Sequence, residues 1–175
     1  FANGREAFQK AGDLLRFAVL AAGLSTVASA TIGVGALPAG GLSPWRELGR
    51  VWLVWWLGDA VGAILVTPLL VLWLSEPRPS WDRRQAAEAL LLLGATFLIG
   101  QAAFGGWLPE PLKDAPLDFL ASPLLLWAAF RFGPRESAIV CALLSALALR
   151  GTIAGFGPFA GRPPEEALPL LQAFL

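Results

Sequence analysis

The residue with the clearest chemical potential in this sequence is Asp59, which lies inside an otherwise apolar run. Residues 50–74 read RVWLVWWLGDAVGAILVTPLLVLWL, with Asp59 as their one acidic group. A carboxylate at membrane depth costs roughly 2.5 to 3.5 kcal/mol on insertion scales, so it must face protein, water or a partner rather than lipid. Three roles are therefore open to Asp59: part of a ligand or signal site, a proton or ion relay, or half of an ion pair that fixes helix packing.

Arg150 is the candidate counter-ion, because it and Asp59 are both expected in the outer half of the membrane. Asp59 follows Arg50 by nine residues, about 13 Å along a helix axis, and Arg150 ends a later apolar segment on the same side. We predict that the two residues line a polar site reachable from the periplasm, and the alternative that they only fix packing stays open. The other candidates for contact with a small ligand or protein signal are Trp55, Trp56, Thr152 and Phe159.

A second set of residues is expected to shape helices and turns. Gly58 and Gly62 form a G-x-x-x-G step, whose default meaning is close helix packing. Pro68 removes a backbone donor, so we expect a kink near Ile64. The other members lie in two Gly/Pro turns and are Arg131, Gly133, Pro134, Gly155, Gly157 and Pro158.

Composition indicates that lipid is the solvent of this chain. Of its 175 residues, 56% are hydrophobic and 15% charged, whereas a soluble domain carries about 25% charge. The 13 basic and 13 acidic residues balance, so the sequence has no excess of positive charge of the kind that binds nucleic acid. The single cysteine and the lack of histidine argue against a metal site, a cofactor or catalysis in this region.

The apolar segments predict an all-α fold, a polytopic transmembrane helical bundle with five spans and the start of a sixth. The five are residues 14–37, 50–74, 86–104, 117–130 and 137–153, and residues 168–175 open the sixth. The fourth is short enough to be a buried or re-entrant piece instead, although the tight RFGPR turn after it favours a helical hairpin. Lys and Arg gather on the first flank and on the second-to-third and fourth-to-fifth loops, which places these in the cytoplasm. We expect one domain over residues 1–175, truncated at both ends.

Four sequence blocks carry a family resemblance. They are ATIGVGAL at residues 30–37, WWLGDAVGAILVTPLL at 55–70, LLLWAAFRFGPR at 124–135, and GTIAGFGPFA at 151–160 followed by LQAFL. Together they resemble the first class of bacterial membrane-associated sensor domains (MASE-type). The resemblance implies an integral inner-membrane input domain, fused in the same chain to a cytoplasmic output domain such as a histidine kinase or diguanylate cyclase. By analogy with such signalling proteins, a homodimer is also expected.

We therefore predict a multi-pass sensory domain of the bacterial inner membrane. A ligand or partner that prefers one helix arrangement would shift the equilibrium, and the last helix would pass the change to the output module. The alternative is a fragment of a transporter or channel with Asp59 as ion or proton relay. An intramembrane enzyme would need a second catalytic group near Asp59, for which the residue inventory is poor.

Overall fold

The computed structural model describes residues 11–41, 45–75, 81–107 and 117–175, and helices make up almost all of these. No strand occurs among the described residues, which confirms the all-α prediction. The longer helices are α2 (Ser25–Ala39), α3 (Leu48–Ser75), α4 (Arg83–Phe104), α5 (Ala121–Arg131), α6 (Pro134–Ile153) and α7 (Pro164–Phe174). The shorter pieces are α1 (Ala11–Arg16), the π-helical η2 (Phe17–Leu24) that joins it to α2, and the 3-10 turns η3 (Trp45–Glu47) and η5 (Leu117–Leu120).

Four helical segments in the described part of the chain are long and apolar enough to cross a membrane. They are Gly12–Pro38, Trp45–Leu74, Arg83–Phe104 and Pro134–Ile153. The predicted fourth span, residues 117–130, is instead the turn η5 followed by α5, whose 11 residues reach only about 16 Å. The predicted count of five spans is therefore not confirmed, and α5 has the length of the short buried or re-entrant piece that the sequence left open. The predicted sixth segment begins four residues early, since α7 starts at Pro164 rather than Leu168.

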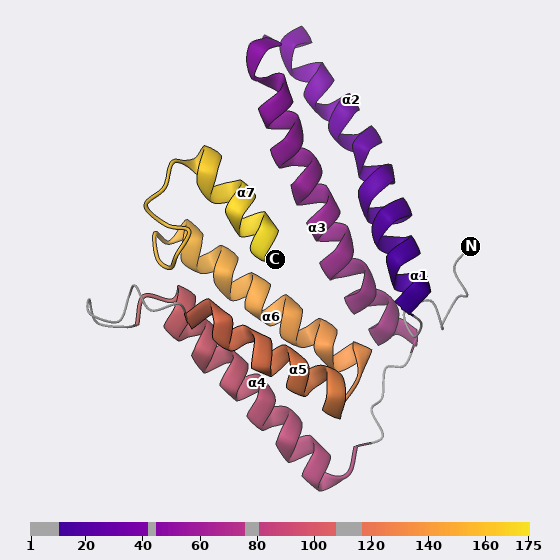
Figure 1. Ribbon diagram of the computed structural model, residues 1–175, viewed down its shortest axis with the longest axis vertical. Helices are drawn as coiled ribbons and strands as arrows, with labels where there is room; N and C mark the ends of the chain where they lie inside the picture. The colour runs from indigo at the N-terminus through magenta and orange to yellow at the C-terminus, as the bar shows by residue number, and fades with distance from the viewer. Residues whose placement is uncertain (1–10, 42–44, 76–80, 108–116) are drawn as a thin grey trace.

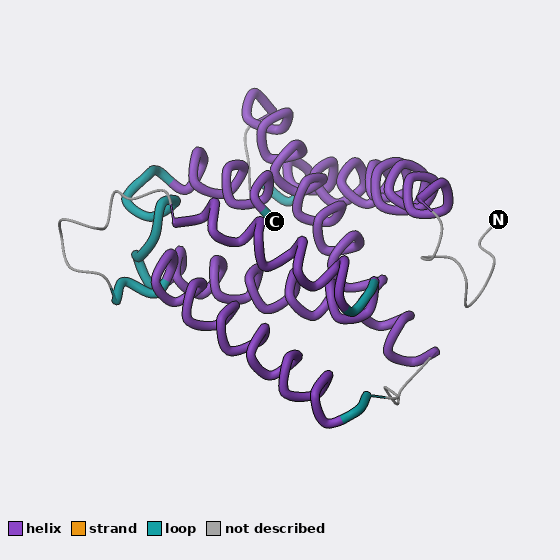
Figure 2. Tube along the Cα trace, turned by 60° about the horizontal axis from the view of Figure 1, so that its bottom comes forward, coloured by secondary structure: helices purple, strands orange, loops and turns teal. Residues whose placement is uncertain are grey.

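The helices form two groups joined through α3 (Figures 1 and 2). In the first group, α2 and α3 form a long antiparallel hairpin. In the second, α4, α5 and α6 pack against one another, and α6 also contacts α3. The last helix, α7, lies beside α3 and runs in the same direction.

Local sequence signals explain where the central helices begin. The side chain of Asp82 accepts a hydrogen bond from the backbone N–H of Gln85, and the Gln85 side chain accepts one from the Asp82 N–H, which forms a capping box for α4. Gly133 adopts a φ of 132°, which ends α5 sharply, and Pro134 then occupies the first position of α6. The predicted RFGPR turn is thus the tight connection of the α5–α6 hairpin.

The main apolar core lies between α4, α5 and α6. Its buried residues are Leu92, Ala121, Leu124, Ala128, Val140 and Leu144. A second cluster joins α7 to these helices through Phe104, Ala148 and Leu171. By contrast, Ala60 is the one buried residue of α3 among those described, and large side chains such as Ile64 and Leu70 are 45% and 53% exposed. The surface of α3 is therefore suited to lipid on much of its circumference.

Candidate functional site

Asp59 lies in the α2–α3 interface and bonds to α2. The Ser29 hydroxyl donates to Asp59 Oδ2 at 2.7 Å, and the Asp59 side chain is half-buried. The small residues of α2 allow this close approach: a Cβ on Gly33 would lie 2.9 Å from the ring of Trp55. The carboxylate therefore receives a neutral donor from the neighbouring helix.

Two tryptophans of α3 form hydrogen bonds with the helical segment that precedes it. The Trp56 indole N–H donates to the Gly23 carbonyl at 2.9 Å, and the Trp52 indole N–H donates to the Thr31 hydroxyl at 3.1 Å. Their rings stack on each other with centroids 5.9 Å apart. Trp55 and Trp56, predicted as candidates for ligand contact, thus lie against the helix that precedes α3 instead: Trp55 lies beside Gly33 of α2, and Trp56 bonds to Gly23 of η2.

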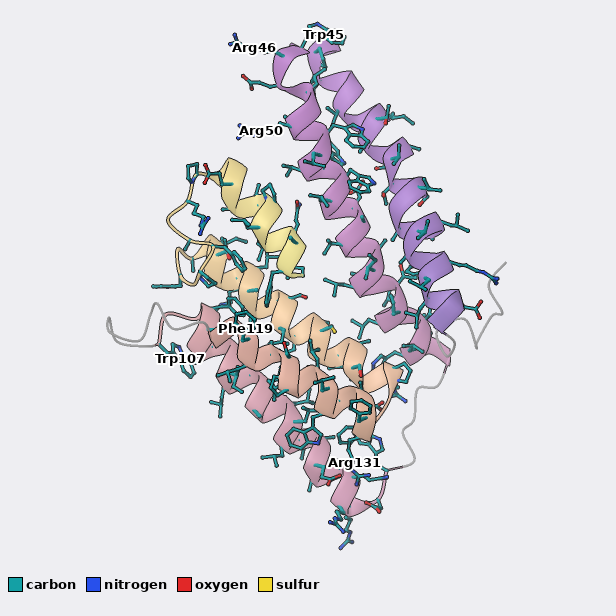
Figure 3. All side chains as sticks on the ribbon, in the orientation of Figure 1. Trp45, Arg46, Arg50, Trp107, Phe119 and Arg131 are labelled. Carbon is teal, nitrogen blue, oxygen red and sulfur yellow. The ribbon has the colours of Figure 1, made fainter. Side chains whose placement is uncertain are left out.

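The last helix reaches the same part of α3 from another side. The Gln172 side-chain amide donates to the Val54 carbonyl at 3.0 Å, and a Cβ on Gly58 would lie 3.0 Å from Gln172 Nε2. The amide oxygen of Gln172 is buried and has no hydrogen-bond partner among the described residues. We call Ser29, Val54, Gly58, Asp59 and Gln172 the polar layer. It joins α2, α3 and α7 within two turns of α3. Figure 3 shows the described side chains of these helices as sticks.

The remaining predicted site residues lie elsewhere. Arg150 is exposed in the last turn of α6, and no ion pair joins it to Asp59 in the described part of the chain. The Thr152 hydroxyl donates to the Ala148 carbonyl of its own helix at 2.8 Å. Phe159 stacks on Phe104, with centroids 6.2 Å apart, at the end of the bundle where α4 and α6 finish. These three residues therefore lie at or just beyond the end of α6, and among the described residues no hydrogen bond or ion pair joins them to the polar layer.

The predicted turn residues take up the positions that their types favour. Gly155 and Gly157 have φ of 82° and 84°, which a side chain rarely adopts, and Pro158 follows them exposed to solvent. In the G-x-x-x-G step, Gly58 meets Gln172 whereas nothing lies within 4 Å of a Cβ on Gly62. Pro68 lies inside α3, which is helical on both sides of it.

Ionic and aromatic contacts gather at the opposite end of the second group. Arg131 pairs with Glu88 at 2.6 Å, which ties the end of α5 to the start of α4. The Arg135 guanidinium lies 3.9 Å from the centre of the Trp73 ring, which ties α6 to the end of α3. The end of α3, the start of α4 and the α5–α6 turn therefore lie on one side of the bundle, as the predicted topology requires.

Sequence reasoning did not single out Ser29, Gln172 or Arg135 as contact residues. Gln172 carries the same signal as Asp59, a polar side chain in an apolar run (LPLLQAFL), and could have been found by it. Ser29 could not, because it is one of several small polar residues on α2. Among the described residues, no three His, Cys, Asp or Glu side chains group to hold a metal ion.

Comparison with known proteins gives one family. The MASE1 family model matches residues 1–175, which is the whole chain. This match confirms the resemblance carried by the four sequence blocks. No curated protein and no solved structure matches the chain.

Proposed function

Because the chain belongs to the MASE1 family of membrane-associated sensory domains of signalling proteins, we propose that it converts a ligand or partner signal into a movement of α7. In this proposal the domain sits in the bacterial inner membrane as part of a homodimer. The signal passes from α7 to a cytoplasmic output module of the histidine kinase or diguanylate cyclase type. The region itself carries out no catalysis.

One observation carries the proposal: α3 contacts α2 and α7 within the same two turns. The Ser29 to Asp59 hydrogen bond is on one side, and the Gln172 to Val54 hydrogen bond is on the other. Val54 and Asp59 are five residues apart, about 7.5 Å along the helix axis. A displacement of α2 against α3 therefore acts on the turn of α3 that holds α7.

The chemistry of Asp59 suits it to respond to a signal. Its carboxyl group lies in an interface where the Ser29 hydroxyl donates to Oδ2. A ligand or partner that competes for this carboxylate separates α2 from α3, and one that adds a donor draws them together. Either one shifts the equilibrium only by its differential affinity for the two arrangements.

The test measures output of the full-length signalling protein in native membranes for Asp59→Asn, Ser29→Ala and the double variant. A hydrogen bond to a charged group contributes about 1.5 to 3 kcal/mol, and we take the lower end because Ser29 is exposed. Each single change should therefore alter basal or stimulated output by roughly tenfold. The double variant should not be additive, because Ser29→Ala removes the donor of this bond and Asp59→Asn replaces its carboxylate acceptor with a neutral amide oxygen, so both changes act on one contact. Ser25→Ala is the matched control, since the Ser25 hydroxyl donates to the Ala21 carbonyl one turn earlier in the chain and not to α3.

The proposal fails if Asp59→Asn and Ser29→Ala accumulate normally in the membrane and keep wild-type output with and without stimulus. Arg150→Gln forms a further arm of the same experiment. Because no contact joins Arg150 to Asp59 in the described residues, its effect should add to that of Asp59→Asn. Non-additivity would instead retain Arg150 as the counter-ion that the sequence predicts.

A further inference from the structure

Gly58 and Gly62 are two equivalent positions on α3, of which α7 occupies one. They are four residues apart, so they lie on the same face of the helix and about 6 Å from each other along its axis. A Cβ on Gly58 would lie 3.0 Å from Gln172 Nε2, whereas nothing lies within 4 Å of a Cβ on Gly62. The face of α3 beside α7 thus offers a filled gap and, one turn further on, an open one.

At the occupied position, the Gln172 side chain forms only some of the hydrogen bonds that its amide group can make. Gln172 makes one hydrogen bond, to the Val54 carbonyl, while its amide oxygen is buried without a hydrogen-bond partner among the described residues. A buried polar atom without a partner has a free-energy cost, which weakens the preference of Gln172 for this position. One turn further along α3, the Gly58 carbonyl is the equivalent acceptor and Gly62 the equivalent gap, because an α-helix repeats its backbone groups.

The apolar contact that Leu171 of α7 makes can also repeat by one turn. Leu171 is buried against Phe104 and Ala148, and Leu168, three residues earlier, is 41% exposed. Since α3 and α7 run in the same direction (Figure 1), a shift of α7 toward Gly62 brings Leu168 to the position that Leu171 holds now. Residues 154–163, which precede α7, form a turn-rich connection long enough to follow such a shift.

We propose that Gly58 and Gly62 form a two-position track for Gln172, along which α7 moves by one helical turn when the domain changes state. Packed elements shift by whole turns because their side chains interlock in discrete registers. This inference rests on the proposed function, in which α7 leads to the output module. It adds the direction and length of the movement and the residues that set its two ends.

The first experiment measures output of the full-length protein in native membranes for Gly58→Ala and Gly62→Ala. A methyl group on residue 58 narrows the first gap, and one on residue 62 narrows the second. The two variants should therefore change basal output in opposite directions, each by at least twofold. Gly94→Ala is the matched control, because Gly94 lies inside the spanning helix α4 with nothing within 4 Å of its added Cβ, and its output should not change.

Gln172→Leu separates a track from general helix packing. Leucine keeps the approximate volume of the side chain but has no amide group to bond the α3 carbonyls. In the Gln172→Leu background, the opposite effects of Gly58→Ala and Gly62→Ala should fall below twofold. Opposite effects of unchanged size in that background would overturn the role of Gln172.

The second experiment measures the position of α7 directly in the full-length protein, without relying on its output. Leu175→Cys, three residues after Gln172, is combined with Val61→Cys or with Leu65→Cys, which lie three residues after Gly58 and Gly62, in a Cys141→Ala background. Membranes are treated with a short bifunctional thiol reagent, so that the track residues themselves stay unchanged. Both pairs should cross-link, and Asp59→Asn should change the ratio of the two yields at least twofold. Cross-linking at residue 61 alone, unaffected by Asp59→Asn, would overturn the track.

The two proposals fail in different ways. If the track is wrong but the sensory function is right, Asp59→Asn still changes output, while Gly58→Ala and Gly62→Ala change it in the same direction or not at all. If the sensory function is wrong, output ignores Asp59, Gly58 and Gly62 alike. The cross-linking ratio then still reports whether α7 occupies two positions.

Discussion

Replacement of Gly151 by alanine should weaken the contact between α4 and α6 at one defined point. A Cβ on Gly151 would lie 2.1 Å from the backbone oxygen of Phe104 and 2.8 Å from its carbonyl carbon. Ordinary contacts begin near 3.4 Å, so the two helices would have to separate by about 1.3 Å there. No rotamer change can relieve this overlap, because the atoms in the way belong to the backbone of α4.

The size of the effect follows from two opposing terms. Overpacking of a tight contact costs typically about 1 to 3 kcal/mol. Alanine in place of glycine favours the helix by at most about 1 kcal/mol, and by less near a helix end such as that of α6. We therefore expect Gly151→Ala to lower the free energy of unfolding by about 1 to 2 kcal/mol.

Replacement of two other glycines by alanine gives stabilities with which Gly151→Ala can be compared. A Cβ on Gly100 would lie 2.5 Å from Leu147 Cδ1, the far end of a flexible side chain that can rotate away, so Gly100→Ala should be close to neutral. Gly94→Ala meets nothing within 4 Å and should stabilise the helix by up to about 1 kcal/mol. The assay measures thermal unfolding of the detergent-solubilised protein. Samples are heated to a series of temperatures, and the folded protein that remains in each is measured by size-exclusion chromatography.

The expected order of stability is Gly151→Ala, then Gly100→Ala, then Gly94→Ala as the most stable. If Gly151→Ala unfolds at or above the wild-type temperature, the close backbone approach of α4 and α6 is incorrect. If all three variants lose stability equally, glycine content rather than local contact sets the effect, and the reasoning from individual distances is refuted.

Two further predictions concern the end of the bundle where α3, α4 and the α5–α6 turn meet. The coupling energy between Arg131 and Glu88, measured with a double-mutant cycle of Arg131→Gln and Glu88→Gln, should be below about 1 kcal/mol, because both side chains are partly exposed; a larger coupling would mean that lipid or protein shields the pair. Arg135→Lys should reduce thermal stability, because lysine lacks the flat guanidinium that stacks on Trp73, and the loss should be smaller in a Trp73→Leu background. An equal loss in both backgrounds would assign the role of Arg135 to contacts other than the ring.

Sequence patterns predicted the main spans because hydropathy and end signals agree there. The capping box at Asp82 and Gln85 and the proline at the first position of α6 fix helix starts within three residues of the predicted segments. The predicted span at residues 117–130 differs because its first four residues form the 3-10 turn η5. Hydropathy counts apolar residues and does not detect where α-helical geometry begins, so this segment was predicted to be longer than α5 is.

Of the residues in the candidate site, only Asp59 could be predicted from the sequence. Asp59 is visible because a charge in an apolar run is costly, whatever the tertiary structure. Its observed partner, Ser29, carries no such signal, and the pairing depends on which helix lies beside α3. The prediction of Arg150 as counter-ion rests on its expected depth in the membrane, and depth alone does not determine which helices are neighbours.

The difference in length between α3 and α6 has a mechanical consequence for the domain. Twenty-eight residues make α3 about 42 Å long, whereas the 20 residues of α6 span about 30 Å, close to the thickness of a hydrocarbon core. A helix that is longer than the bilayer tilts or thickens the lipid around it, and α3 does run at an angle to α6 (Figure 1). A thinner bilayer increases this mismatch and a thicker one relieves it. Lipid composition therefore changes the tilt that the bilayer imposes on α3 and with it on the α2–α3 hairpin. A change in this tilt reaches α6 through the contact between Trp73 and Arg135.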